Sequence, residues 1–497
     1  MGLPGKPFPT LPRDEIALRL AQRNQAIALY RFRTAIVKEV GKENVSCDYQ
    51  KMTSPVPESI AAHFKGKKIT LMGLGLLGRG VGDAEFLAAC GAELIVTDLK
   101  TAEELAPSIE RLKDFPSVVY HLGMHQLADF ENRDMVIRAP NTPLDSPFIA
   151  HAREHDIPVE MDASLFAKLS PATIVGITGT RGKSTTTHLI YEMARAAGNN
   201  PVLGGNERGT ATLPLLQTTD KDSTVVLELD SWQLQGFADA KISPHVSVWT
   251  NFLPDHMNYY KGDMDRYFED KAAIARFQKK GDAFVSTRNI IEKIDQRFGM
   301  LESVCIADPV LPADWKVALL GEHNRKNAAC ACAAARALGI SDDVIKKTLE
   351  TFAGLPGRLE LLGEKNGVAF YDDGNSTTPE ALSVALDALA SVGRPIVLIA
   401  GGSDKELDYT TLVPKIERSV KKLILFNGKA TDKITASLSA GFSYSPAANM
   451  NEAFATAVGS AAPGDIVLLS PGATSFGIFK NEYDRGDQFK AAFKALK

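Results

Sequence analysis

The chain has 497 residues, of which 44% are hydrophobic and 23% are charged, and its formal net charge is −4 at pH 7. A chain of this length is too long for one hydrophobic core and predicts two to four domains. The small net charge excludes an electrostatic basis for binding nucleic acid or a membrane surface. No stretch approaches the roughly 18 apolar residues of a transmembrane helix, and the proline-rich N-terminus lacks the apolar core of a signal peptide.

The cysteines are few and scattered: Cys47, Cys90, Cys305, Cys330 and Cys332. Their odd number and irregular spacing indicate reduced thiols in a cytoplasmic protein, not a disulfide framework or a zinc site.

Three segments precede the first clear strand. Residues 1–12 are rich in proline and glycine and predict disorder. Residues 13–44 predict one amphipathic helix with basic residues between its apolar positions. This helix could be a docking surface, but we favour a solvated helix or a poorly ordered extension. Residues 48–66, with Pro55 and Pro57, predict a linker.

From Lys67 the chain alternates between strands and helices. Lys68–Met72 predicts a strand, and the loop Gly73-Leu-Gly75-Leu-Leu-Gly78 follows it and opens a helix through Cys90. The next strand, Leu94–Thr97, ends at Asp98. This order matches the dinucleotide fingerprint and predicts a site for a nucleotide diphosphate, without identifying the nucleotide. Further short strands are expected at Met135–Arg138 and Pro158–Glu160.

The most informative stretch begins at Thr173. A buried strand, Thr173–Ile177, precedes a loop with Gly179 and Gly182, and Lys183, Ser184 and Thr185 then lead into a helix, Thr186–Ala197. Strand, glycine-rich loop and helix form the arrangement that cradles phosphate. Lys183 would reach the β- and γ-phosphates, and the Ser184 hydroxyl would bind Mg²⁺. The strict pattern would need glycine where Ile177 stands, and the alternative is a glycine-rich turn with a capped helix.

Three ionisable residues follow in the same domain. Glu228 lies in an apolar strand, Thr224–Leu229, where a carboxylate is costly unless it binds a cation or a salt-bridge partner. His256 follows the strand Val246–Thr250, at the sheet edge where α/β proteins place ligands, although a lone histidine is more often structural. Lys271 lies on a charged helix, and from spacing alone we expect a surface lysine.

The last third of the chain alternates again. A helix is expected at Ala328–Leu338, and Gly354–Arg358 predicts a hinge. The expected strands are Val368–Tyr371, Pro395–Ala400, Leu423–Phe426 and Ile466–Leu469. The last of them runs into a polar loop at Ser470–Phe476.

Six segments together resemble one known family. They are Gly-Ile-Thr-Gly-Thr-Arg-Gly-Lys-Ser-Thr, Leu-Glu-Leu-Asp-Ser-Trp-Gln-Leu, Asp-His-Met, Gly-Glu-His-Asn-Arg-Lys-Asn, Gly-Leu-Pro-Gly-Arg, and the tail from Ser470 to Gly486. In this order they resemble the Mur ligases of peptidoglycan synthesis, from Lys67 to the C-terminus. The tail and the short N-terminal domain look most like the members that add D-glutamate to UDP-N-acetylmuramoyl-L-alanine.

The resemblance implies an α/β protein of three domains. These are a Rossmann-like UDP-binding domain (67–168), a central P-loop ATPase domain (169–355) and a C-terminal Rossmann-like α/β domain for the amino acid (356–497). Residues 1–66 have no counterpart in the family pattern. The implied reaction uses ATP to turn the substrate carboxylate into an acyl phosphate, which the amine of the amino acid attacks. Positioning and cation charge supply most of the catalysis when two anions are joined. We expect a cytoplasmic monomer that acts on small molecules.

By position in the family motifs, the resemblance also implies roles for individual residues. The implied catalytic residues are Lys183, His256 and Lys271. Ser184 and Glu228 would bind one Mg²⁺ and His256 a second, and Lys271 matches a lysine that the family carbamylates into a metal-binding carboxylate. The ATP contacts would be Gly179, Thr180, Gly182, Lys183, Ser184, Thr185, Asn324, Asn327, Arg358 and Asp373. The UDP-substrate contacts would be Gly73, Gly75, Leu76, Leu77, Asp98, Lys100, Asn206 and Gln233. The amino-acid contacts would be Lys405, Ser475 and Phe476, a set that suits a dicarboxylic amino acid.

The chain departs from the family pattern at a few positions. Arg181 replaces an asparagine of the P-loop, Gly357 replaces a histidine of the hinge, and Asn375 stands where the family has a lysine. Glu482 stands where an aromatic residue is expected, and Tyr483 follows it. These departures bear on amino-acid specificity and not on the use of ATP.

Other functions remain open from the residues. Another Mur-type or folylpolyglutamate-type ligase would share the ATP chemistry, although the Gly73–Gly78 loop disfavours a folate enzyme. An NAD-dependent oxidoreductase would leave Lys183 and Glu228 unexplained. A non-catalytic nucleotide-binding homologue is disfavoured because Lys183, Glu228, His256 and Lys271 occur together.

Overall fold

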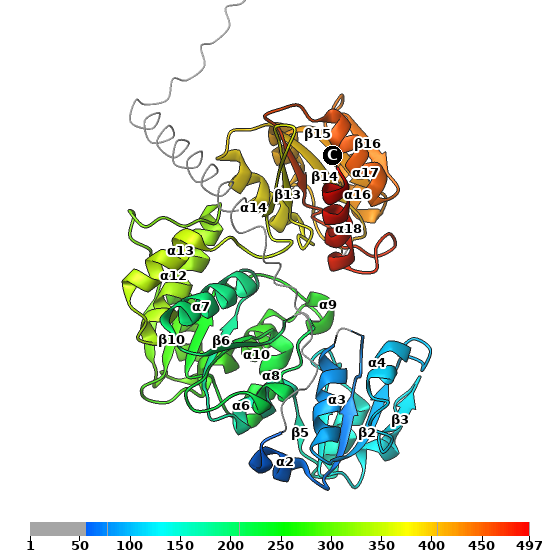
Figure 1. Cartoon of the computed structure of the whole chain (residues 1–497), viewed down its shortest axis with the longest axis vertical. Coiled ribbons are helices and arrows are strands. Elements are labelled where there is room, and N and C mark those ends of the chain that lie inside the picture. Colours follow the sequence, from blue (N-terminus) through cyan, green and yellow to red (C-terminus); the bar gives the residue numbers. More distant parts are fainter. Residues whose placement is uncertain (1–55, 77, 208, 405, 497) are drawn as a thin grey trace, which may run out of the picture. The chain divides into compact units, whose positions relative to one another are not determined.

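The computed structural model describes residues 56–76, 78–207, 209–404 and 406–496 (Figure 1). Their strands form three sheets, of five, six and six strands, with helices between them. The chain is therefore the multi-domain α/β protein that the sequence predicts. The predictions for residues 1–55, including the helix at 13–44, lie outside the described residues.

The described residues divide into two compact units. One takes in the described part of Val45–Trp315 together with Lys326–Leu349, and the other takes in Lys316–Arg325 and Glu350–Lys497. The first unit carries the first two sheets, and the second unit carries the third sheet. The three predicted domain boundaries remain a prediction.

The first sheet is entirely parallel, in the order β3-β2-β1-β4-β5. Its strands are β1 (Lys68–Met72), β2 (Glu93–Asp98), β3 (Val119–Leu122), β4 (Met135–Arg138) and β5 (Val159–Glu160). Its helices are α2 (Glu58–Phe64), α3 (Arg79–Ala89), α4 (Ala106–Arg111), η1 (Leu127–Phe130), α5 (Pro147–Glu154) and α6 (Asp162–Leu169). Both faces are buried, because alternate residues of β4 enter two separate apolar clusters.

One prediction fails in this region, and one strand was not predicted. The linker expected at 48–66 contains α2, because Phe64 at the end of this helix is fully buried in the first apolar cluster. Strand β3 was not predicted, since its sequence Val-Tyr-His-Leu is only partly buried and lacks an apolar run.

The second sheet is also parallel, in the order β11-β10-β9-β6-β8-β7. Its strands are β6 (Thr173–Thr178), β7 (Pro201–Gly205), β8 (Thr224–Glu228), β9 (Val246–Trp249), β10 (Ala283–Ser286) and β11 (Val304–Ala307). Its helices are α7 (Lys183–Ala197), η2 (Leu213–Gln217), α8 (Ser231–Ala240), α9 (Met257–Tyr260), α10 (Met264–Arg276), α11 (Arg288–Phe298), α12 (Glu322–Ala337) and α13 (Asp342–Thr351). Strand β6 lies between β8 and β9, so ligands are expected at its carboxyl end.

The third sheet has the order β12-β13-β17-β14-β15-β16 and is parallel except for β12. Its strands are β12 (Glu360–Lys365), β13 (Val368–Asp372), β14 (Ile396–Gly401), β15 (Val420–Phe426), β16 (Tyr444–Ala447) and β17 (Ile466–Leu469). Its helices are α14 (Pro379–Ala390), α15 (Val413–Ser419), α16 (Lys429–Ser437), α17 (Met450–Ser460) and α18 (Glu482–Ala495).

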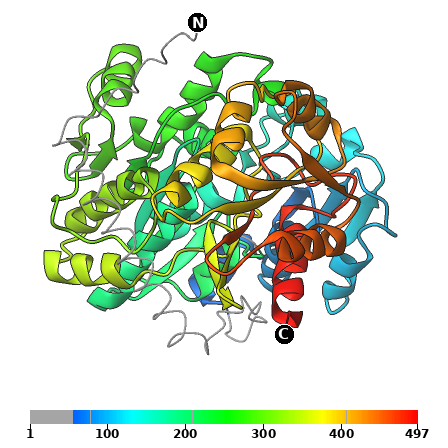
Figure 2. The same ribbon diagram turned by 90° about the horizontal axis from the view of Figure 1, so that it is seen from above.

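Helices cover both faces of the third sheet (Figure 1, Figure 2). In β14, Ile396 and Leu398 enter the apolar cluster with α14 and α15, whereas Val397 and Ile399 enter the cluster with α17 and α18. The sequence of β14 is continuously apolar because the strand is buried on both faces. No helix in the described part of the chain is long and apolar enough to cross a membrane.

Candidate active site

The predicted phosphate loop connects β6 to α7 in the way the sequence indicates. Gly179 has φ +147° and Gly182 has φ +84°, which favours glycine at both positions. A Cβ atom would lie 1.9 Å from Thr250 Oγ1 at Gly179 and 2.2 Å from Asn327 Oδ1 at Gly182. The loop therefore packs too tightly for side chains at these two positions. It ends at the N-terminus of α7, a 15-residue helix whose first backbone N–H groups favour binding of an anion.

The loop is fastened to the segment that follows β9. Thr180 N–H donates to the Asn251 carbonyl at 3.0 Å, and its hydroxyl donates to the Leu253 carbonyl at 3.0 Å. The Arg181 guanidinium pairs with the Asp255 carboxylate at 2.7 Å. Arg181, one of the departures from the family pattern, thus ties the phosphate loop to the neighbour of His256.

Two lysines donate to the same carbonyl oxygen, that of Gly179. Lys183 Nζ lies 3.1 Å from it, and Lys271 Nζ lies 3.0 Å from it and 3.1 Å from Thr178 Oγ1. Lys271 is 1% exposed, so the surface position expected from spacing alone is wrong. Burial, and next the charge of Lys183, hold the pKa of Lys271 well below its ordinary value.

The signal for a buried Lys271 was present in the sequence. On α10, Tyr267 lies one turn before it, and Ile274 and Ala275 lie one turn after it, and all three are buried. Lys271 therefore interrupts an apolar stripe.

Glu228 ends β8 and is 4% exposed. The single hydrogen bond that the described residues give its carboxylate comes from Asn206 Nδ2, at 3.3 Å. No residue of the described ranges forms an ion pair with it, so the salt bridge considered as an alternative has no partner there. A buried carboxylate with one long hydrogen bond retains lone pairs for a cation.

A residue that the sequence analysis did not single out, Arg79, positions Asn206. Arg79 is the first residue of α3, and its Nη2 donates to Asn206 Oδ1 at 2.8 Å. Asn206 in turn contacts Glu228, so a chain of hydrogen bonds connects the glycine loop of the first sheet to the predicted metal ligand. Its position directly after Gly78 was the available signal.

His256 lies at the start of α9 with φ +55°, and its ring packs on Trp232 with 4.6 Å between centroids. Its Nε2 lies 3.9 Å from Asp255 Oδ2. Burial lowers the pKa of His256, and the Asp255 charge opposes this shift. The neutral ring is the form that can bind a metal.

Gln233 is fully buried near the start of α8, where it forms a capping box with Asp230. Its Nε2 amide has no hydrogen-bond partner in the described part of the chain. An unpaired buried donor suits the predicted contact with substrate.

In the first sheet, Asp98 holds the glycine loop. Its Oδ2 accepts from the N–H groups of Leu74 at 2.9 Å and Gly75 at 3.0 Å, and its Oδ1 accepts from Lys100 N–H at 2.9 Å. The chain at Gly73 and Gly75 has positive φ, and Leu76 is half exposed. Leu77 lies outside the described residues.

The remaining predicted nucleotide contacts lie on α12 and in the loops before β12 and after β13. Asn324 and Asn327 lie on α12, which begins at Glu322 and not at Ala328 as expected. Asp373 accepts hydrogen bonds from Leu359 N–H at 3.1 Å and Ser470 Oγ at 2.7 Å. Burial raises the pKa of Asp373 to about 7. Arg358 lies in the loop before β12, and its N–H donates to the Leu355 carbonyl.

The predicted amino-acid contacts follow β17. Ser475 is buried, whereas Phe476 is 64% exposed and its carbonyl accepts from the Ser403 hydroxyl. Lys405 lies outside the described residues. The sequence analysis missed Arg485, which is fully buried and donates to the carbonyls of Gly374 at 2.9 Å and Ala473 at 3.0 Å. It thereby joins the loop after β13 to the loop after β17.

Two departures from the family pattern contact each other. Gly357 has φ +68°, and a Cβ there would lie 3.0 Å from Asn375 Nδ2. Asn375 N–H donates to the Gly357 carbonyl at 3.1 Å. Glycine at 357 and asparagine at 375 therefore form one compact turn contact. Glu482 is the first residue of α18.

The residues at the end of β6 fit a magnesium nucleotide. The loop conformation excludes side chains at Gly179 and Gly182, Lys183 supplies an amine beside the loop, and Glu228 is a buried carboxylate with free lone pairs. Ser184 lies one residue into α7, as in a phosphate-binding loop.

Comparison with known proteins places the chain. Two family models match: the Mur ligase middle domain at residues 177–302 and the Mur ligase glutamate ligase domain at residues 357–472. A relative from Roseiflexus sp. (strain RS-1), named UDP-N-acetylmuramoylalanine--D-glutamate ligase, is 37% identical over 86% of this chain and 98% of its own. Relatives of the same name from Borreliella burgdorferi (strain ZS7) and Streptococcus mutans are 35% and 33% identical, over 97% and 98% of their lengths and 86% and 88% of this chain. The chain belongs to the Mur ligase family.

Solved structures agree on the fold of this Mur ligase. UDP-N-acetylmuramate-alanine ligase from Thermotoga maritima is 19% identical, with a TM-score of 0.58 over 87% of this chain and 100% of its own. MurF ligase from Thermotoga maritima, solved in complex with ADP, is 18% identical, with a TM-score of 0.54 over 80% of this chain and 94% of its own.

Family membership confirms the resemblance and the class of reaction. The Mur ligase is an ATP-dependent enzyme that forms an amide bond, and its function lies in making peptidoglycan precursors. The oxidoreductase alternative is wrong. The roles of individual site residues stay predictions.

Proposed function

We propose that this Mur ligase joins D-glutamate to UDP-N-acetylmuramoyl-L-alanine and converts ATP to ADP and phosphate. The substrate assignment rests on the sequence match to relatives named UDP-N-acetylmuramoylalanine--D-glutamate ligase. The match covers almost the whole length of these relatives. The geometry at the carboxyl end of β6 supports the ATP chemistry.

The first step transfers a phosphoryl group. A carboxylate oxygen of the substrate attacks the γ-phosphorus, the bond to ADP breaks, and an acyl phosphate forms. Both reactants are anions, so fixed positive charge stabilises the transition state. We assign this role to Lys183, whose ammonium the loop holds at the Gly179 carbonyl, and we assign phosphate contacts to Gly179, Thr180, Gly182, Ser184 and Thr185.

Metal ions would be held by Ser184, Glu228, His256 and Lys271. When bound, Mg²⁺ supplies charge that neutralises the phosphate oxygens. Mg²⁺ strongly prefers oxygen ligands, which makes Glu228 the strongest member of this set.

Carbamylation of Lys271 is part of the proposal. A neutral Nζ can attack carbon dioxide, form an N–C bond and release a proton, which leaves a carboxylate on the side chain. The buried position beside Lys183 favours the neutral amine. The Lys271 ammonium is thus replaced by a carbamate anion. Lys183 and bound metal ions would stabilise its negative charge.

In the second step the amine of D-glutamate attacks the acyl carbon through a tetrahedral intermediate, and phosphate leaves. We assign contacts with the UDP substrate to Asn206, Gln233 and the loop around Gly73, Gly75, Leu76, Leu77, Asp98 and Lys100. We assign further nucleotide contacts to Asn324, Asn327, Arg358 and Asp373, and amino-acid contacts to Lys405, Ser475 and Phe476. We also propose that the enzyme acts as a monomer in the cytoplasm, because the cytoplasm supplies ATP and UDP-linked precursors.

The test is phosphate release from ATP and Mg²⁺ with UDP-N-acetylmuramoyl-L-alanine and a panel of D- and L-amino acids. We expect release that needs both the UDP substrate and D-glutamate. Phosphate release with another amino acid would support the ligase activity but contradict the specificity for D-glutamate. If the folded protein released no phosphate with any of these amino acids, the assignment of UDP-N-acetylmuramoyl-L-alanine as the acceptor would be wrong.

A further inference from the structure

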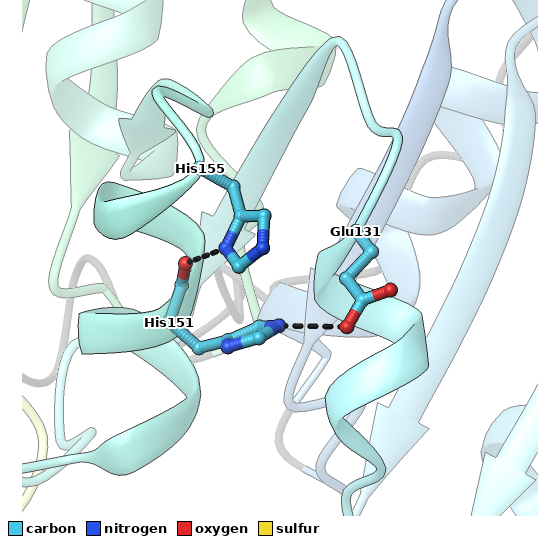
Figure 3. Close-up of side chains that lie close together, drawn as sticks. All are labelled: Glu131, His151 and His155. Carbon is cyan, nitrogen blue, oxygen red and sulfur yellow. Dashed lines mark hydrogen bonds and ion pairs between the residues drawn. The ribbon is translucent and has the colours of Figure 1, made fainter.

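Three side chains outside the predicted reaction site form a cluster of possible metal ligands (Figure 3). Glu131 directly follows η1, His151 lies on α5, and His155 is the C-cap residue directly after α5. One ligand atom from each residue lies within 4.8 Å of the other two. No step of the proposed reaction uses these residues.

The two histidines are four residues apart on one helix, so they lie on the same face. Their ring centroids are 4.2 Å apart, and His151 Nε2 lies 2.9 Å from Glu131 Oε1. The close-up shows the Glu131 carboxylate facing the His151 ring, with the His155 ring beside it (Figure 3).

The backbone under this cluster is fixed by buried neighbours. Phe130, directly before Glu131, and Ala152, directly after His151, are both fully buried in the same apolar cluster. The ligand atoms therefore start from positions that packing holds, although His155 itself is exposed. Such preorganisation lowers the entropy that a bound ion must overcome.

The hydrogen bonds fix which nitrogen of His155 is available. Its Nδ1 lies 2.8 Å from the His151 carbonyl oxygen, which can only accept. Nδ1 must therefore carry the proton and donate it, so Nε2 of the neutral ring has a lone pair. A histidine that binds a metal through one nitrogen commonly donates the other N–H to a backbone carbonyl in this way.

We propose that Glu131, His151 and His155 bind one divalent transition-metal ion of the zinc type. Two imidazoles and one carboxylate are the ligand set that Zn²⁺ and its neighbours take, with water in the remaining position. Mg²⁺ takes oxygen ligands and is not expected there. The ion would join the end of η1 to α5.

Binding requires small movements of the side chains and the removal of the proton from His151 Nε2. Ligand atoms around tetrahedral Zn²⁺, at about 2.0–2.1 Å from the metal, lie about 3.4 Å apart. The exposed side chain of His155 can turn to reach this spacing. The proton that His151 Nε2 shares with Glu131 must leave or move to Nδ1, so binding weakens as the pH falls.

The test is calorimetric titration of the full chain with Zn²⁺, in a non-thiol reductant and in excess Mg²⁺. The excess Mg²⁺ competes for the predicted reaction site, whose ligands include Glu228. We expect one Zn²⁺ per chain to be lost in the double variant His151→Gln and His155→Gln. Each single variant should weaken this site by at least about tenfold.

The matched control is His121→Gln. His121 on β3 also pairs with a carboxylate, that of Asp129, at 2.6 Å, but the two belong to no cluster of three possible metal ligands in the described part of the chain. This variant should keep the Zn²⁺ site. A second measurement, the Zn²⁺-induced rise in thermal midpoint, should be present in the wild type and the control and absent from the double variant.

The proposal is overturned if the folded double variant binds Zn²⁺ with wild-type stoichiometry and affinity, or if the wild type binds none in excess Mg²⁺. Co²⁺ provides an independent reading, because a tetrahedral nitrogen and oxygen site gives visible absorption bands. Bands of equal strength in the wild type and the double variant would equally overturn it.

Discussion

The carbonyl oxygen of Gly179 accepts hydrogen bonds from two amines, and this arrangement separates the roles of the two lysines. Lys183 begins α7 directly after the phosphate loop, where we propose that its charge contacts phosphate. Lys271 is buried behind it, where burial and the charge of Lys183 favour the neutral form. The two lysines differ in position, and the buried position lowers the pKa of Lys271.

Lys183→Ala is expected to lower kcat by about 100-fold or more, because removal of one preorganised donor from a transition-state anion costs this much. The measurement is phosphate release with saturating substrates. Circular dichroism should show an unchanged fold. Wild-type turnover in this variant would contradict the assignment of the phosphate loop.

Lys271→Ala is expected to abolish turnover and to recover part of it when a small carboxylate such as acetate or formate is added. The carboxylate would occupy the space left by the carbamate and restore the negative charge. Lys183→Ala is the matched control, since an added anion cannot replace its cation. Failure of every small carboxylate to rescue Lys271→Ala would count against carbamate chemistry.

Arg79→Met removes the guanidinium that holds Asn206 and keeps most of the apolar stem. We expect weaker binding of the UDP substrate, seen as a raised KM, and a smaller fall in kcat through Glu228. Arg153→Met is the control, because Arg153 pairs with Asp239 at the exposed surface. Equal kinetics for the two variants would show that the chain from Arg79 to Glu228 has no part in the reaction.

At the scale of elements, the segments after β1 and β6 require glycine at positions where a Cβ atom would collide with neighbouring atoms. A Cβ at Gly80 would lie 2.4 Å from the Gly73 carbonyl oxygen and 2.5 Å from that of Leu74. Helix α3 therefore approaches the loop so closely that no side chain fits. Gly80 lies two residues after Gly78, the third glycine of the fingerprint, and this close approach requires glycine there as well.

Gly80→Ala is expected to destabilise the first sheet by displacing the loop, while Gly459→Ala should stabilise its helix. Gly459 lies within α17, and nothing is within 4 Å of the position of its Cβ. Alanine in a helix is favoured over glycine by about 1 kcal/mol. Thermal midpoints should move in opposite directions, and a midpoint that rises in both variants would contradict the close approach.

The elements that the sequence predicts well are those buried on both faces. Strands β1, β6, β8 and β14 have continuous apolar runs, and their positions are confirmed. Strands β12 and β16 were missed because edge strands are only partly buried and carry polar residues. Strand β10 was missed although it is buried, because its four residues, Ala-Phe-Val-Ser, are too few to form a clear apolar run.

The candidate site divides in a similar way. Short-range patterns identify Lys183 and Ser184, because loop, lysine and helix are adjacent in sequence. The partnership of Arg79 with Asn206 joins residues that are 127 positions apart, and no local pattern reports such a contact. Arg485 presents the same difficulty, since its two carbonyl partners belong to different loops.

At the scale of the whole molecule, buried carboxylates connect stability to pH. Burial raises the pKa of Asp373 from 3.8 to about 7 and that of Asp372 to about 6. In the unfolded chain both groups would lose their protons near pH 4. Between about pH 4 and 7 these two carboxyl groups therefore bind more protons in the folded state than in the unfolded state, and their contribution to the free energy of unfolding falls as the pH rises.

Asp373→Asn is expected to flatten this dependence between about pH 4 and 7, because the amide cannot ionise. The measurement is the thermal midpoint of the ligand-free chain across this range, compared with the wild type. Asp432→Asn, at an exposed position of α16, is the control and should follow the wild-type slope. A slope in Asp373→Asn that equals the wild type would contradict the raised pKa.

The order of strands in the third sheet also has a consequence for biosynthesis. Strand β17 is the last strand of this sheet along the chain, yet it lies between β13 and β14 and pairs with both. While the ribosome is still making residues 373–465, β13 can pair only with β12, through a hairpin whose tight turn carries Asn366 and Gly367 at positive φ. The sheet can close only after Leu469 has left the exit tunnel. Until then the nascent chain exposes two unpaired strand edges, which makes this stage of translation the one at which a holding chaperone would matter most.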